Sequence, residues 1–422
     1  MFNIEIVEKD NLKILGLLVR YKRVLLGFSL RDLGEITNIS HTLISNFERG
    51  LMIPNKDTIK DIFIVLKLDF YDNQEMTSEF NRLYKKIFKH LVYYEYEEAG
   101  VLIIEIEKNK GIYNNSAVVV NFTIIRLLFY VLTNTKTDEL QRIMKEFEVV
   151  IDFFSDNQKQ LFYFIQGLEY LNKEFYKESR QFFEKALEIG DHKVDLLINE
   201  HYVISLSKSN KFVDSREIAN KCILEYESKT NYVRAMRLRT RIAHDFIRIH
   251  KFEEAKEIYN FVNDYSIKYK IKDLENRCNT RLAQIAVIQN KYELANEYLK
   301  KVTPEFSKMY HYLMFDLFVY YKDNKKLLEY YKSTMSKDWV KKHKKSYNFF
   351  KLIIMRNIDG YMDKAEYERL LLNQIDIAIK SDDAEMLEVS SKHLMNFYKS
   401  ERKYKKGLEI SEHLLHYLKN GV

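Results

Sequence analysis

Apolar and polar positions near the start of the chain alternate with the spacing of short helices. Within residues 29–50 the apolar positions recur every three or four residues on both sides of a break at Asn38. Ser29 and Ser40 precede the two apolar runs and can cap helices with their hydroxyls. Asn38 tolerates the left-handed backbone of a tight turn, and Gly50 can end the second helix. The pattern therefore predicts two short helices joined at Asn38.

Three further helices are predicted around this pair. The periodicity predicts a first helix over 12–27, a fourth over 57–67 after Pro54, and a long helix over 75–94 that leads away. The positions expected to face the core are Leu15, Leu18, Val19 and Leu25 in the first helix, Leu43, Ile44 and Phe47 in the second helix of the pair, and Ile59, Ile62, Phe63 and Leu66 in the fourth.

The front of the second helix of the pair carries short hydrogen-bonding side chains. They are His41, Thr42, Ser45 and Asn46, on the side opposite the apolar positions. A helix with a buried back and such a front fits the major groove of DNA, where base edges present donors and acceptors. These four side chains are the candidates for reading bases.

Charge is unevenly distributed around this pair of helices. The whole chain carries +7, residues 11–31 carry five basic side chains and no acid, and residues 32–70 carry four basic and six acidic ones. Lys22, Arg23 and Arg31 are therefore expected to contact phosphates. Because a segment with so little net charge would bind one half-site weakly, we expect a homodimer on two half-sites.

These pieces resemble the lambda-repressor/Cro type of helix-turn-helix, the XRE family. The matching residues are Phe28-Ser29-Leu30-Arg31-Asp32-Leu33, Gly34, Ile39-Ser40, Ile44-Ser45, Glu48-Arg49-Gly50, and Pro54 with Thr58-Ile59. Two positions depart from the family pattern, which commonly has Gln at Leu30 and Gly at Asn38. The resemblance covers residues 12–70 and implies binding to a double-stranded DNA operator. The alternative is a small helical bundle that has lost DNA binding.

From residue 95 onward, an aromatic residue followed three positions later by a small one recurs through the chain. The pairs are Tyr96 and Ala99, Tyr176 and Ser179, Phe212 and Ser215, Phe252 and Ala255, Tyr292 and Ala295, and Tyr404 and Gly407. Those from 176 to 292 are 36, 40 and 40 residues apart, near the tetratricopeptide period of about 34. A small residue lets two antiparallel helices approach, and the aromatic residue fills the next gap.

The repeat and the scarcity of Pro (two) and Gly (11) predict an all-α fold. Its second part is expected to be a right-handed, tetratricopeptide-like α-solenoid with a concave groove. The sequence thus predicts a helix-turn-helix DNA-binding domain over 1–72 and a linker helix over 73–94. Residues 95–422 would form the repeat domain, for peptide binding and dimerisation.

The first helix of each pair lines the concave side of such an array, which places polar residues in the groove. Counting back from the repeat positions selects Glu200, Arg237, Thr240, His244, Arg248, Arg277, Thr280 and Gln284, with Asn199, Asn276 and Asn279 on the shoulders. Amides and guanidiniums in such places can satisfy the unpaired backbone groups of an extended peptide. The alternative is a solvated groove without a ligand. Because Arg237, Arg248 and Arg277 make the groove positive, we expect a peptide with an acidic residue or a free C-terminal carboxylate.

An XRE headpiece followed by a tetratricopeptide array resembles the peptide-responsive quorum-sensing regulators of Gram-positive bacteria, the Rap/Rgg/NprR/PlcR/PrgX group. The resemblance implies a homodimeric transcription factor whose operator affinity is set by a short signalling peptide. It also implies that groove asparagines hold the peptide backbone, a role carried to Asn199, Asn276 and Asn279 by repeat position. The alternative is an adaptor whose array binds a regulatory protein such as a response regulator, with DNA binding secondary.

Little in the sequence points to an enzyme, a metal or a membrane. The 11 His show no metal-ligand spacing, and no HExxH, phosphate-binding Gly loop or nucleophile elbow occurs. The basic run 341–345 is expected to be a solvated helix face. Residues 1–11 do not form a signal peptide, and 117–132 is too short to span a bilayer and is expected to be a buried helix. We therefore expect a cytoplasmic protein with no catalytic site, cofactor or metal and no membrane contact.

Overall fold

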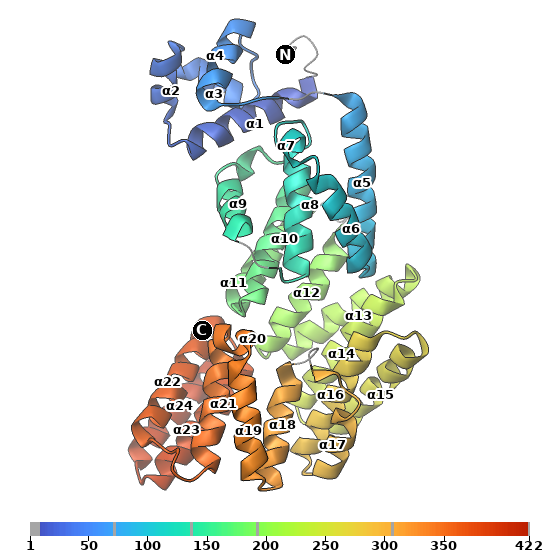
Figure 1. The fold of residues 1–422 in the computed structure, drawn as a ribbon, viewed down its shortest axis with the longest axis vertical. Helices are drawn as coiled ribbons and strands as arrows, with labels where there is room; N and C mark the ends of the chain where they lie inside the picture. Colours follow the sequence, from blue (N-terminus) through green and yellow to red (C-terminus); the bar gives the residue numbers. More distant parts are fainter. Residues whose placement is uncertain (1–8, 71–72, 136–137, 191–193, 305–307, 421–422) are drawn as a thin grey trace. The chain divides into compact units, whose positions relative to one another are not determined.

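The computed structural model describes residues 9–70, 73–135, 138–190, 194–304 and 308–420 (Figure 1). Over these residues the chain forms helices and no β-strand, which confirms the predicted all-α fold. The helices group into two compact units, the first made of residues 1–172 and 181–198 and the second of 173–180 and 199–422. The predicted three-part division of the chain stays a prediction. None of the described helices combines the length and the apolar composition needed to cross a bilayer.

The first four helices match the predicted headpiece. They are α1 (Lys9–Leu25), α2 (Leu30–Thr37), α3 (His41–Glu48) and α4 (Lys56–Leu66). Ser29 caps α2 by accepting from the backbone N–H of Asp32, whose carboxylate accepts from the N–H of Ser29 in return. Asn38 adopts the left-handed conformation, with φ 53° and ψ 38°, as the turn pattern predicts. Ser40 caps α3, and Gly50 follows it with φ 65°.

The headpiece core is the predicted one apart from two positions, Leu25 at the end of α1 and the half-buried Leu43. All the other inward positions named above are buried. Leu25 is 43% exposed, because α1 ends at this residue.

Gly16 has a role that its sequence context did not reveal. A Cβ there would lie 2.3 Å from the carbonyl oxygen of Phe47, so this glycine allows α1 to approach α3 closely.

The next helices complete the first unit. They are α5 (Gln74–Tyr93), α6 (Tyr96–Glu107), α7 (Lys110–Tyr113), α8 (Val119–Leu132), α9 (Asp138–Glu148), the short η2 (Ile151–Phe153), α10 (Asp156–Asn172) and most of α11 (Tyr176–Glu188). Phe80 of α5 packs edge-on against Phe122 of α8, so the predicted linker helix is part of this unit's core. Helix α8 is buried on most of its surface, as predicted for 117–132, and its Arg126 pairs with Glu107 at 2.8 Å.

In the first part of the second unit the helix ends recur every twenty residues. Its helices are α12 (Asp195–Lys208), α13 (Phe212–Ser228), α14 (Tyr232–Arg248), α15 (Phe252–Lys268), α16 (Lys272–Ile288) and α17 (Tyr292–Leu299). Residues 210, 230, 250, 270 and 290 all have φ between 58° and 60° and each ends a helix. The N–H of the following residue bonds at 2.8–3.0 Å to the carbonyl five positions earlier. Two such steps give the 40-residue repeat.

The remaining helices also belong to the second unit. They are α18 (Lys308–Tyr320), α19 (Asn324–Ser336), α20 (Asp338–Lys342), α21 (Lys344–Asn357), α22 (Lys364–Ser381), α23 (Ala384–Ser400) and α24 (Tyr404–Asn420). The aromatic residue of each predicted pair begins a helix, namely α6, α11, α13, α15, α17 and α24. Their small partners are buried where the helices cross, as Ala99, Ala255 and Ala295 illustrate at 0% exposure, except Gly407, which is half-buried.

The contact between α10 and α11 allows a direct test of this close helix packing. A Cβ at Gly167 would lie 2.5 Å from ring atoms of Phe183, which is fully buried and cannot move aside. We expect Gly167→Ala to lower the free energy of unfolding by about 1–3 kcal/mol, as overpacking does. Urea unfolding of the full chain measures this change. The matched control is Gly111→Ala, where nothing lies within 4 Å of the added atom. An equal effect of both variants would contradict the packing argument.

Candidate functional site

The front of α3 presents the side chains that the sequence nominates for reading DNA. His41 and Thr42 are exposed, and Ser45 and Asn46 are half-buried. The back of the helix is fixed by Ile44 and Phe47, both at 0% exposure in the headpiece core. The helix therefore has the two faces that a major-groove reader needs, one anchored and one polar.

Arg23 does not occupy the position of a phosphate contact. Its side chain is buried, with Nε and Nη2 donating to the two carboxylate oxygens of Glu48 at 2.5 and 2.9 Å. Its Nη1 donates to the carbonyl of Phe28 at 2.8 Å. The sequence-based expectation for Arg23 is therefore wrong, because its donors are used inside the headpiece to tie α1 to the end of α3. Arg31 is exposed and Lys22 is half-buried, and both remain candidates.

The Arg23–Glu48 pair should decide the stability of the headpiece. Arg23→Ala would leave the buried Glu48 carboxylate without its partner, which costs about 3–5 kcal/mol in comparable pairs. We expect α3 amides to exchange with deuterium correspondingly faster in this variant. The exposed Arg31→Ala should leave their exchange unchanged within about 0.5 kcal/mol. Slow exchange in the Arg23 variant would show that the pair does not hold the helix.

Helix α1 also contacts the rest of the first unit. The Tyr21 hydroxyl donates to Glu146 of α9 at 2.5 Å, and the Arg20 guanidinium lies 4.7 Å from the ring centre of Phe153. Burial and the Glu146 carboxylate raise the pKa of Tyr21, so its hydroxyl stays protonated. A cavity of about 420 Å³ lies beside this contact and includes Lys22 among its lining residues. The headpiece is thus tied to α9 by specific contacts.

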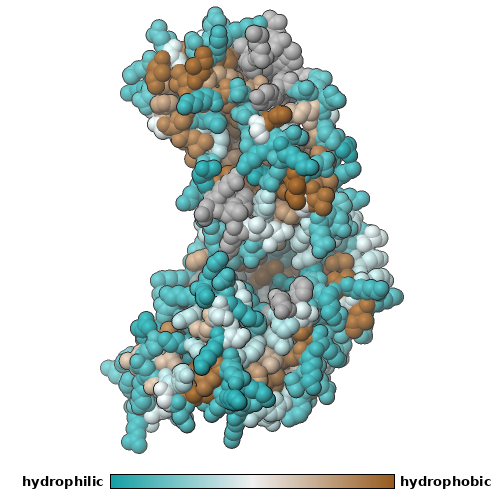
Figure 2. Space-filling model, in the orientation of Figure 1, coloured by the Kyte–Doolittle hydropathy of each residue, from teal (hydrophilic) through white to brown (hydrophobic). Residues whose placement is uncertain are grey.

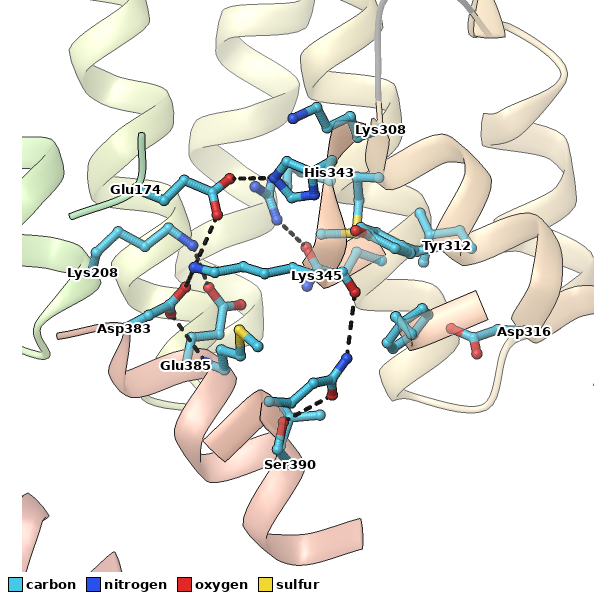
Figure 3. A pocket seen from close by; sticks show the side chains of 18 of the residues that line it. Glu174, Lys208, Lys308, Tyr312, Asp316, His343, Lys345, Asp383, Glu385 and Ser390 are labelled. Carbon is cyan, nitrogen blue, oxygen red and sulfur yellow. Dashed lines mark hydrogen bonds and ion pairs between the residues drawn. The ribbon is translucent and has the colours of Figure 1, made fainter. Parts of the chain in front are cut away.

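The second unit contains a larger cavity, of about 560 Å³ (Figure 3). The apolar side chains that line it, here called the apolar wall, are Val287, Ile288, Met309, Leu313, Phe349, Met386 and Val389. The rim is charged and includes Glu174, Lys208, His343, Lys345, Asp383 and Glu385. A volume in the range of roughly 300–1,000 Å³ with mixed apolar and polar walls is typical of ligand sites.

Ion pairs across the rim join helices that are far apart in the sequence. Lys345 Nζ lies 2.9 Å from Glu174 and 3.3 Å from Asp383, and His343 Nε2 lies 3.0 Å from Glu174 (Figure 3). Lys208 Nζ pairs with Glu385 at 2.8 Å. The partners are separated by 169 residues for the His343–Glu174 pair and by 177 for the last.

These pairs keep the rim charged despite its burial. Burial alone would raise the pKa of Glu174, but the hydrogen bond from His343 and the charge of Lys345 outweigh it and leave the pKa below its ordinary value. In the same way burial lowers the pKa of Lys208, and the Glu385 and Asp383 carboxylates more than reverse this effect. The rim therefore consists of mutually satisfied charges.

A smaller cavity of about 300 Å³ adjoins the first and shares Arg281, Lys308 and Met309 with it. It is lined mainly by polar side chains of α14 and α16, which are the first helices of their pairs. Five of the eleven predicted peptide-binding residues line one of the two cavities: Thr240, His244, Arg277 and Thr280 line the smaller one, and Gln284 lines the larger. Repeat position thus selected some of the residues that line these cavities, and their role in binding stays a prediction.

The other six predicted residues line neither cavity, and several of them are used inside the fold. Glu200 is buried and accepts from Tyr226 at 2.7 Å and from Arg234 at 2.6 Å. Asn276 accepts from the backbone N–H of Thr303 at 3.0 Å, and Asn279 donates to the carbonyl of Glu275 at 3.0 Å. Asn199 is half-buried.

The predicted positive character of the groove is also reduced by pairing. Arg237 forms an ion pair with Asp273, and Arg248 donates to Asn210 at 3.1 Å and pairs with Glu388 at 3.3 Å. Periodicity gives the face of a helix on which an arginine lies, but it cannot give a partner on another helix. Two of the three arginines expected to attract an acidic ligand are therefore already neutralised.

Some cavity residues were missed by the sequence reasoning. His343 and Lys345 belong to the basic run 341–345, which was expected to be a solvated helix face, yet both line the larger cavity. Asp316 also lines it and carried no signal in the sequence, since an isolated acid in an aromatic helix resembles any surface residue. Among the described residues no group of three or more His, Cys, Asp or Glu is placed to hold a metal ion.

Comparisons with known proteins agree with this architecture. Residues 19–72 match the family model described as helix-turn-helix. No match was found among curated proteins. A Rap protein complexed with Competence and Sporulation Factor has a similar structure, at 13% identity and a TM-score of 0.68 over 81% of this chain and 98% of that chain.

Two structures of the quorum sensor NprR are also similar. The apo form from B. thuringiensis has 11% identity and a TM-score of 0.58 over 82% of this chain and 100% of that chain. NprR in complex with its cognate peptide NprX has 13% identity and a TM-score of 0.61 over 79% and 99%. At such identities the likeness shows the fold alone. The predicted fold is confirmed: an XRE-type helix-turn-helix precedes a tetratricopeptide-type helical solenoid like those of Rap and NprR.

Proposed function

We propose that this protein is a sequence-specific DNA-binding transcriptional regulator controlled by a short signalling peptide. The observation that carries the proposal is the combination, in one chain, of an anchored helix-turn-helix with a polar α3 front and a 560 Å³ cavity in the helical solenoid. The solved relatives add support, because Rap is complexed with Competence and Sporulation Factor and NprR with its peptide NprX.

On the DNA side, α3 is proposed to enter the major groove with His41, Thr42, Ser45 and Asn46 facing base edges. Asn46 is the strongest candidate for direct readout, because an amide can donate to and accept from adenine at the same time. Arg31 and Lys22 are proposed to contact phosphates. These contacts add affinity that falls with salt but carry no sequence information.

Asn46→Ala tests this assignment of roles. We expect it to weaken operator binding by roughly 1–3 kcal/mol and to relax the preference at one base pair. Fluorescence anisotropy on a panel of single-base operator variants measures both effects. Arg31→Ala is the matched control, expected to weaken all sequences alike and to reduce the salt slope by about 1. An Asn46 variant with an unchanged preference would assign base readout to another face.

On the ligand side, the peptide is proposed to bind across the two adjoining cavities. Thr240, His244, Arg277, Thr280 and Gln284 remain the proposed contacts, with Asn199 on the shoulder. Side chains that project from successive inner helices can bond the backbone of an extended peptide at several points. Arg277 and its neighbour Arg281 suit a terminal carboxylate.

A homodimer is proposed on the basis of apolar surface. Helix α24 exposes Tyr404, Leu408 and Leu415, at 54–65%, along one side of the helix. The headpiece also exposes the apolar side chains of Ile36, Leu51, Met52, Ile53 and Ile64. Figure 2 shows hydrophobic surface on the headpiece, brown at the upper left. Contiguous apolar surface of this kind marks contact sites in soluble proteins.

The dimer proposal is tested at α24. We expect Leu408→Glu to shift the full-length protein from dimer to monomer, since a charge would be buried in the contact without a partner. Light scattering during size-exclusion chromatography gives the mass directly. Leu224→Glu is the matched control, because Leu224 is a similarly exposed leucine, at 69%, on α13. A wild-type protein that elutes as a monomer would contradict the proposal outright.

The whole proposal is tested by one titration. DNA from upstream of the protein's own gene is titrated with full-length protein, with and without synthetic candidates for a small peptide encoded beside the gene. A hundredfold change in operator affinity would correspond to about 2.7 kcal/mol of coupling. Specific DNA binding that responds to a peptide supports the proposal. Peptide binding without DNA binding would favour the adaptor function instead.

A further inference from the structure

The charges on the rim of the 560 Å³ cavity are matched by one another. Lys208 is paired with Glu385, and Lys345 lies between Glu174 and Asp383. The rim therefore needs no counter-charge from a ligand. The remaining acid that lines the cavity is Asp316, which lies away from the rim on α18.

Asp316 lies beside the apolar wall. It follows Leu313 by three residues and Tyr312 by four, so all three lie on the same side of α18, and Phe349 of α21 lines the same cavity. Figure 3 shows Asp316 and Tyr312. No hydrogen bond or ion pair joins its carboxylate to any residue in the part of the chain that the structure describes, and Figure 3 draws none. Arg356 acts on Asp316 only from a distance, and its guanidinium lies 3.1 Å from His393.

An unpaired carboxylate beside apolar side chains is unfavourable for the folded protein unless something bonds to it. Burial raises the pKa of Asp316 to about 6, an effect only partly offset by the charge of Arg356. At neutral pH the group is therefore still mostly ionised. The empty cavity thus holds a negative charge that no described side chain neutralises at contact distance.

We propose that Asp316 receives a cationic group of the bound ligand, a guanidinium or an ammonium, while the apolar wall contacts the carbon chain that carries it. This assignment rests on the proposed peptide-receptor function and names the chemistry of the peptide: it contains an arginine or lysine side chain. A guanidinium fits best, because it can donate two parallel hydrogen bonds to a carboxylate. Phe349 and Leu313 would cover the methylene groups.

The adjoining smaller cavity would bind the other end of the same ligand. Arg241, Arg277 and Arg281 line it, and Asp273 is the acid among its described lining residues. A C-terminal carboxylate therefore suits this end, while the basic side chain reaches Asp316 at the other. The expected peptide therefore carries a basic side chain at one end and a carboxylate at the other. The groove arginines alone would predict an acidic peptide.

Two synthetic peptide pools test the assignment. Each contains hexapeptides with free C-termini and random flanking residues, with one internal position fixed as arginine in the first pool and as citrulline in the second. Citrulline has nearly the same shape as arginine but no charge. Full-length protein is incubated with both pools, complexes are isolated by gel filtration, bound peptides are identified by mass spectrometry, and the best arginine–citrulline pair is measured by calorimetry.

We expect the arginine peptide to bind wild-type protein roughly 10- to 100-fold more tightly than its citrulline counterpart. Asp316→Asn should abolish this preference and leave the affinity for the citrulline peptide unchanged. The matched control is Asp359→Asn, an exposed acid between α21 and α22 that should retain the full preference. Circular-dichroism melting checks that both variants fold.

The outcomes separate this assignment from the proposed function. Equal binding of the two peptides to wild-type protein overturns the role of Asp316, whatever the variant does, and leaves the peptide receptor standing. A preference that survives in folded Asp316→Asn also overturns it and places the cation elsewhere in the cavity. If no peptide from either pool binds, the peptide-receptor function fails and the assignment fails with it.

Discussion

The ion pairs made by Lys345 and Lys208 are the contacts on which the cavity of the second unit depends. Helices of a solenoid contact mainly their neighbours, so nothing in the repeat itself brings α21 and α23 to the beginning of α11 and the end of α12. Lys345 does so by contacting both Glu174 and Asp383, and Lys208 by contacting Glu385. Buried pairs of this kind add little net stability but are unfavourable to break, so they specify one arrangement. They fix which walls face each other, and therefore the shape a ligand meets.

The features predicted correctly from sequence are those that local physics determines. The turn at Asn38 and the caps at Ser29 and Ser40 depend on residues at most four positions away. The left-handed residues at 210, 230, 250, 270 and 290 set the helix length in the same local manner, which is why periodicity revealed the 40-residue repeat. Leu25 was predicted wrongly, because the exposure of the last residue of a helix depends on what packs beside it and not on its neighbours in the sequence.

The features predicted wrongly or missed depend on partners far away in the chain. Arg23 is a basic residue in a basic segment, as a phosphate contact would be. Only the structure shows that its guanidinium pairs with Glu48, 25 residues later. Within the basic run 341–345, Lys345 meets Asp383 and Glu174 in the cavity, and no pattern within the run could reveal them. The sequence predicts on which face of a helix a charged residue lies. The residue with which it forms an ion pair is known only from the tertiary structure.

Helix α11 carries residues of both compact units. Its first residues, with Glu174 just before them, belong to the second unit and include Tyr176 of the cavity lining. Its later turns belong to the first unit, where Phe183 packs tightly on Gly167 of α10. The same unit holds the Tyr21–Glu146 bond to the headpiece helix α1. Under the proposed function, a ligand can change operator affinity only if it binds two conformations of the protein with different affinity.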